Sequence, residues 1–168
     1  KDKLLLDLLM FVIKKSHYNP VAINDNFSRE VYKEYIEALD PSKRFFLQSD
    51  INEFSKYQLE LDDQLSGKDL TFFNLTYDRL MLRMAEGNII FKKILNTPFD
   101  YKNEEDFNID YDKAPYARNN TELKDKWRKQ IKLSTLSSLT EKQKSEEDKK
   151  IKDPAYVVKS DAVLESET

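Results

Sequence analysis

The run LTFFNLTYDRLMLRMAEGNIIFKKILN, residues 70–96, is rich in leucine, methionine and isoleucine and ends shortly before Pro98. It predicts one long helix, because its apolar residues keep a helical spacing and proline disfavours helical backbone in the residue before it. Gly87 lies inside this helix and costs it about 1 kcal/mol relative to alanine. Close packing of another helix at that point would explain the glycine.

The composition agrees with a helical protein. Only 2 of the 168 residues are glycine, Gly67 and Gly87, against an average near 7%. Glycine supplies the positive φ angles of hairpins and phosphate-binding loops, so both kinds of structure are disfavoured. With 39% hydrophobic residues the chain can still bury a core. We therefore predict an all-α fold, a single irregular bundle of five to six helices.

Other helices are predicted before and after this run. The first, residues 3–16, is apolar over most of its circumference, as in helices buried on several sides. A second covers residues 27–39, and a third opens at Ser49-Asp50, with Glu53 as capping-box partner, and ends at Gly67. A fifth begins at Asn119 and carries Leu123, Trp127 and Ile131 on its buried side; a sixth runs from a Thr140 cap, with Gln143 as its partner, to about Lys152.

The remaining stretches are connections. Apolar and polar residues alternate between 99 and 111, which allows one short β-hairpin. We assign residues 1–152 to the helical domain and 153–168 to a linker or the start of a further helix. Asp153-Pro154 resembles a cap with a first-turn proline, and Ser160-Asp161 is a second possible cap. The last turns are expected to be weakly held.

Charge and residue usage exclude several function classes. The chain has 28 Lys+Arg against 31 Asp+Glu, and without a basic excess a nucleic-acid partner is disfavoured. There is no cysteine, hence no thiol catalysis, zinc–thiolate site or disulfide. The apolar run 4–13 is about ten residues long, too short for the roughly 20 that cross a bilayer. We expect no cofactor and no membrane insertion.

Three groups of residues are candidate sites. His17, the only histidine, has no paired base or nucleophile nearby in sequence, so a hydrogen-bonded structural role is favoured. The acidic loop 104–112 has calcium-type ligands but lacks the EF-hand glycine and terminal Glu, so a solvated loop is favoured and metal binding stays open. Ser42 and Lys43 are adjacent in an expected exposed turn, where a lysine base would not be desolvated. No catalytic residue is predicted.

A series of short strings carries a resemblance to a known family. In chain order they are His17-Tyr18, Leu39-Asp40-x-Ser42, Phe46-Leu47-x-Ser49-Asp50-x-x-x-Phe54, Ala114-Pro115, Asn120-x-Glu122-Leu123 and Trp127-x-x-x-Ile131-Lys132. Their order and spacing over about residues 9–133 resemble the N-terminal domain of bacterial tail-specific (carboxy-terminal-processing) proteases. Residues 134–159 match the family only loosely.

The resemblance implies a longer polypeptide. In it a peptide-binding PDZ domain and a serine protease domain with a Ser–Lys dyad follow this helical region, in the periplasm or cell envelope. The helical region would frame the substrate cavity and contact protein substrates and adaptors. None of the family's catalytic motifs falls in this chain, so its motif positions are interpreted as structural. A chain that starts at Lys1 rather than Met also suggests a processed or cloned fragment.

A second hypothesis comes from another class: a free-standing helical adaptor or scaffold. The two differ in whether the reading frame continues past Thr168 into PDZ and protease sequence.

Overall fold

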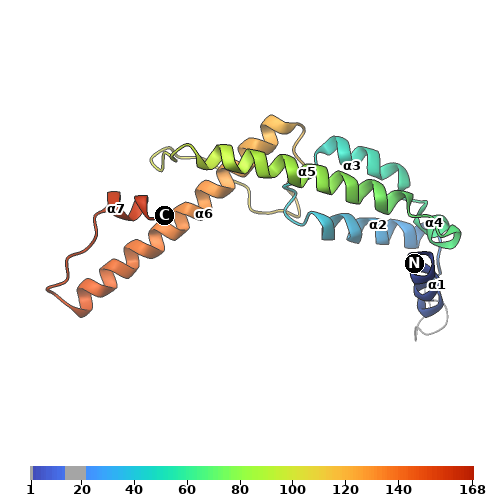
Figure 1. The fold of residues 1–168 in the computed structure, drawn as a ribbon, viewed down its shortest axis with the longest axis horizontal. Coiled ribbons are helices and arrows are strands. Elements are labelled where there is room, and N and C mark those ends of the chain that lie inside the picture. The colour runs from blue at the N-terminus through green and yellow to red at the C-terminus, as the bar shows by residue number, and fades with distance from the viewer. Residues whose placement is uncertain (1, 14–21) are drawn as a thin grey trace.

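The structure is a computed structural model that describes residues 2–13 and 22–168. Within these residues the chain forms seven α-helices and one 3-10 turn, and no strand, so the predicted all-α class is confirmed (Figure 1). His17 and Tyr18 lie outside the described residues. The elements are α1 (Asp2–Phe11), α2 (Asp25–Leu39), α3 (Gln48–Phe54), η2 (Ser55–Tyr57), α4 (Leu61–Gly67), α5 (Thr71–Leu95), α6 (Asn120–Lys152) and α7 (Asp161–Ser166).

The main body is built around aromatic side chains from α2, α3 and α5. Phe72 lies at the centre, with its ring centroid 5.6 to 6.4 Å from those of four other aromatic residues. Figure 1 shows α5 running along both α2 and α3. The buried members of this core are Tyr32, Ile36, Phe46, Phe54, Leu61 and Phe72.

The predicted third helix is broken in two, and its expected cap at Ser49-Asp50 was wrong. Helix α3 begins at Gln48, because the Asp50 carboxylate accepts the backbone N–H of Leu47. Helix α4 starts anew at Leu61, where the fully buried Ser28 of α2 holds the next residue. The Ser28 hydroxyl donates to the Asp62 carboxylate at 2.6 Å and accepts the Asp62 N–H at 2.9 Å. These two bonds attach the first turn of α4 to α2.

The hairpin allowed between residues 99 and 111 is not formed. Asp100 and Asn108 instead accept the backbone N–H two residues further on, as in Asx turns, and such local bonds compete with a strand ladder. The described residues contain one isolated parallel bridge, between Leu47 and Ala117.

Helix α6 is continuous, so the predicted helix start at Thr140 was wrong. The Thr140 hydroxyl donates to the Leu136 carbonyl inside the helix, 2.9 Å away. The start of α6, by contrast, is the predicted one, since Asn119 Oδ1 accepts the Glu122 N–H at 3.0 Å. The C-terminal half of α6 projects from the body as an arm (Figure 1).

Helix α7 folds back against this arm. It confirms the helix predicted after Ser160, and its Leu164 is only 2% exposed. The expected weak hold of these last turns stays a prediction. The Glu146 carboxylate of α6 also accepts from the Tyr156 hydroxyl and the Lys159 N–H, at 2.9 and 3.1 Å. Asp153-Pro154 starts no helix; Asp153 ends α6 by donating its N–H to the Lys149 carbonyl.

Helix α1 is not the buried helix predicted. Four of its large apolar side chains are 59 to 73% exposed: Leu4, Leu5, Leu8 and Phe11. It is attached near α4 by an ion pair between Asp7 and Lys68, at 2.7 Å. No described helix has both the length and the apolar character needed to span a membrane.

Candidate functional site

Two groups of predicted family positions, far apart in sequence, lie side by side in the structure. The segment 40–50, which includes the first turn of α3, meets the segment 112–127 through a backbone bond of 2.9 Å, from the Gln48 N–H to the Ala117 carbonyl. Next to this bond the buried residues Leu47, Ala117 and Leu123 form a small apolar cluster. We call this meeting place the signature junction.

Asp40 organises the loop side of the junction. Its side chain is 1% exposed and follows the last turn of α2. Its two carboxylate oxygens accept the backbone N–H groups of Arg44, Phe45 and Phe46, each at 2.9 Å. The turn therefore depends on this carboxylate, which satisfies three donors that would otherwise lack a partner.

Lys43 joins the two sides of the junction. It has a positive φ of 48°, and its ammonium donates to the carbonyls of Asp112 and Ala114, at 3.0 and 2.9 Å. The amine is therefore bound to main-chain oxygens on the opposite segment. Ser42, the neighbour that a Ser–Lys dyad would use, is partly buried.

Asp50 ties α3 to α5. Its side chain is fully buried and receives two hydrogen bonds from Arg83, at 2.8 and 2.9 Å, and one from Arg79. Burial by itself raises the pKa of Asp50, but the bonds from Arg83, Leu47 and Arg79 outweigh it and the net pKa is lowered. The carboxylate is therefore charged and fully paired.

Trp127 fastens α6 to the body. Its indole N–H donates to the Arg44 carbonyl at 2.8 Å, and its ring meets the edge of Phe45 with centroids 5.9 Å apart. A Cβ built on Gly87 would lie 3.4 Å from the Trp127 ring, so the predicted close helix packing at this glycine is confirmed. Trp127 itself is partly rather than fully buried.

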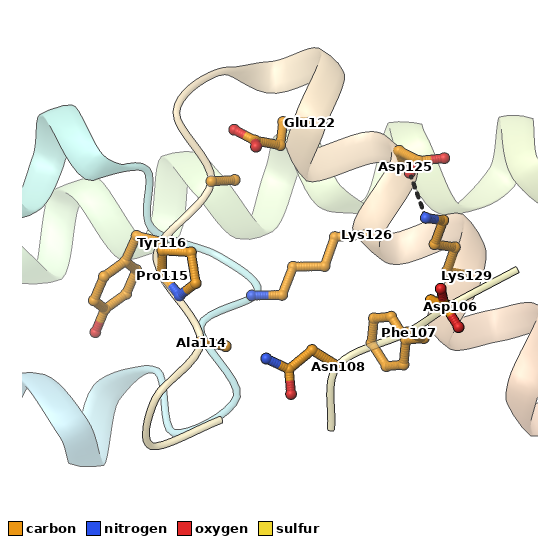
Figure 2. A pocket seen from close by; sticks show the side chains of 11 residues that line it. Asp106, Phe107, Asn108, Ala114, Pro115, Tyr116, Glu122, Asp125, Lys126 and Lys129 are labelled. Atoms are coloured by element: carbon orange, nitrogen blue, oxygen red, sulfur yellow. Dashed lines mark ion pairs between the residues drawn. The ribbon is translucent and has the colours of Figure 1, made fainter. Parts of the chain in front are cut away.

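A pocket of about 220 Å³ opens beside the junction (Figure 2). The Lys126 side chain crosses it, and its ammonium donates to the Lys43 carbonyl at 2.8 Å. Burial lowers the pKa of Lys126. On the rim Lys129 pairs with Asp125 at 3.5 Å. The pocket is lined by Asp106, Phe107, Asn108, Ala114, Pro115, Tyr116, Ala117, Glu122, Asp125, Lys126 and Lys129.

The acidic loop 104–112 lies against α6. Glu105 binds both Arg128 and Lys132, the latter at 2.7 Å. Its bonds from Arg128 and Lys132 lower the Glu105 pKa to about 2. No group of three or more acidic or histidine side chains suited to a metal ion occurs among the residues that the structure describes. Glu105 thus attaches the loop to α6.

The junction includes most, but not all, of the predicted positions. Phe46 and Phe54 lie in the aromatic core and Leu39 packs against it, while Ser49, Pro115 and Asn120 are exposed. Glu122 binds Arg118 at 3.2 Å. Sequence reasoning missed Arg79 and Arg83, the partners of Asp50. It also missed the main-chain contacts of Lys43 and Lys126. One signal was available, because two arginines four residues apart share one face of the helix, and an anionic partner is needed where such a face is buried.

Comparison with known proteins agrees with the predicted resemblance. The family model described as the tail specific protease N-terminal domain matches residues 9–166. That match continues through α6 and α7, beyond the residues on which the resemblance was based. A tail-specific protease from Haemophilus influenzae is 30% identical over 126 residues, which are 74% of this chain and 18% of that protein. The chain therefore spans less than a fifth of this relative's length.

Proposed function

The chain belongs to the family of tail-specific protease N-terminal domains, and on that premise we propose that it is the non-catalytic helical part of a periplasmic carboxy-terminal-processing serine protease. The observation that carries the proposal is the set of contacts made by the family positions in the signature junction. Asp40, Asp50 and Trp127 all bind groups within the chain, and together they lock α3, α5 and α6 to one another. Residues with such contacts build a scaffold rather than attack a substrate.

The nucleophile and base of the parent enzyme belong, on this proposal, to downstream domains. A general base must reach the proton that it abstracts and must have a suitable pKa. The two junction lysines do not fit this need, because Lys43 and Lys126 both donate to main-chain carbonyls. The Ser–Lys dyad and the PDZ domain are therefore assigned to polypeptide beyond this chain.

The role proposed for this domain is to frame the substrate cavity. A wall of a cavity has to hold its shape while polypeptide moves past it, and the paired carboxylates of the junction supply that rigidity. The α6 helix, 33 residues long, extends for about 50 Å at the usual rise per residue. The C-terminal half of α6, which forms the arm, also offers surface to protein substrates or an adaptor. Placement in the periplasm rests on the family resemblance, and its test is cell fractionation.

The test compares the parent protein with variants of the junction. Asp50→Asn in the full polypeptide should raise KM for a long protein substrate, while kcat for a short peptide that needs no framing stays the same. Glu53→Gln is the matched control, since Glu53 pairs with the same Arg79 but is 40% exposed. Equal effects of both variants on both substrates would contradict the framing role.

Cleavage of an unfolded protein by this chain alone, abolished by Ser42→Ala, would contradict its non-catalytic role.

A free-standing helical adaptor is the second candidate. The exposed apolar side chains of α1 and α5 favour it, because surfaces of that kind mark protein interaction sites. A gene that ends with this domain would decide for the adaptor, and one that continues into PDZ and protease sequence would decide for the protease.

A further inference from the structure

Helix α5 carries an apolar face that the described chain leaves in solvent. On its packed side Phe72, Thr76, Gly87 and Ile94 are buried. A helix that is apolar on both sides is normally covered on both. The large apolar side chains of α5 that are 39 to 59% exposed are Phe73, Tyr77, Met81, Leu82, Met84, Ile89, Phe91 and Leu95.

Part of this face repeats every seven residues. Successive members are four and then three residues apart, the 3.5-residue spacing of a seam along which a second helix packs. The seam is about 27 Å long at the rise of an α-helix. We call it the α5 seam, and it consists of Tyr77, Met81, Met84, Asn88, Phe91 and Leu95.

The seam also has polar features that a partner would have to match. Asn88, the one polar member, is exposed; a single polar residue in such a seam sets the register of the two helices. Asp78 and Lys92 flank the seam on one side, near its two ends, and both are exposed. A matching helix would carry a basic residue opposite Asp78 and an acidic one opposite Lys92.

We propose that the α5 seam is covered by an amphipathic helix from the same parent polypeptide, outside the chain described here. The inference rests on the proposed function. Its support is the size of the missing remainder, since the aligned part is only 18% of the Haemophilus influenzae relative. The seam does not include the buried residues of α5, Phe72, Thr76, Gly87 and Ile94, and its apolar side chains are exposed in the described chain.

The experiment uses the full-length parent protein with a photo-crosslinking amino acid in place of Met84 or, in a second protein, Phe91. Ile151 is the matched control position, because it is apolar, helical and 78% exposed on the arm. After irradiation, mass spectrometry identifies the linked peptides. The expected result is a link from both seam positions to one helical segment outside this chain, and loss of that link when the probe is at Ile151.

Each other outcome overturns the proposal. Links to a second copy would make the seam a dimer interface, links to a test substrate would make it a substrate surface, and no link beyond the Ile151 control would leave it bare. Proteolysis by the same preparations separates the two claims. Protein that links as expected but cleaves nothing refutes the proposed function alone, whereas active protein without the internal link refutes the seam alone.

Discussion

Replacement of Asp50 by alanine tests whether the signature junction holds the body together. The fully buried carboxylate accepts four hydrogen bonds, from Leu47, Arg79 and twice from Arg83. Its removal leaves two guanidinium groups whose side chains are only 23% and 11% exposed. A buried charge that loses its partner costs about 3–5 kcal/mol.

The lower end of that range is expected here. Arg79 keeps a bond of 2.7 Å to Glu53, and Arg83 keeps one of 2.8 Å to Glu86. We therefore expect Asp50→Ala to lower the free energy of unfolding by about 3 kcal/mol. In a chain of this length that is a fall of roughly 6–12 °C in the thermal midpoint.

The assay is urea unfolding followed by Trp127 fluorescence and circular dichroism, repeated across pH. Glu53→Ala is the control and should cost no more than about 1 kcal/mol, as exposed ion pairs do. The folded pKa of Asp50 lies below its ordinary value, so its contribution is complete above roughly pH 4 and is lost as the pH falls through the folded pKa. The gap between wild type and Asp50→Ala should narrow below that pH. An Asp50→Ala protein as stable as Glu53→Ala, or a gap that does not change with pH, would refute the reasoning.

Three further predictions concern α6 and its contacts. Trp127→Phe should cost about 1–2 kcal/mol in urea unfolding, because the Arg44 carbonyl loses its donor; no change would mean that water replaces the indole. Gly87→Val should cost about 1–3 kcal/mol by overpacking against Trp127, whereas a gain in thermal midpoint would show that the two helices separate easily. The Glu146 pKa is lowered to about 2, first by the Lys149 bond. The protection of amides around Tyr156 from hydrogen exchange, corrected for the intrinsic pH dependence of exchange, should therefore fall between about pH 4 and 2, and Glu146→Gln should lack this protection already at neutral pH.

Helices whose apolar residues follow a regular helical spacing were predicted well. Helix α5 was expected over residues 70–96 and spans Thr71–Leu95, and α2 was expected over 27–39 and spans Asp25–Leu39. Their ends lie next to prolines or short polar caps, which act within a few residues and can be identified in a single sequence.

Helix continuity was harder to predict, because it depends on distant partners. The break before α4 results from the bond between Ser28 and Asp62, which are 34 residues apart. Thr140 shows the converse case. A threonine hydroxyl can cap a helix or bond to a carbonyl one turn back, and only the packing of α6 decides between these. The apolar residues of α1 were recognised, but the sequence pattern did not reveal that Leu4, Leu5, Leu8 and Phe11 lie exposed in the described chain.

The family positions in the signature junction also divide into those that contact near neighbours in sequence and those that contact distant residues. Asp40 acts on donors at most six residues away, so a turn after α2 was predictable from Asp40-Pro41-Ser42. Asp50 acts on arginines 29 and 33 residues away, and no spacing rule relates α3 to that face of α5. Trp127 reaches Arg44 across 83 residues. An ordered series of weak strings could therefore identify the family before it could explain it, because Asp50 and Trp127 are each one half of a contact whose other half lies far along the chain.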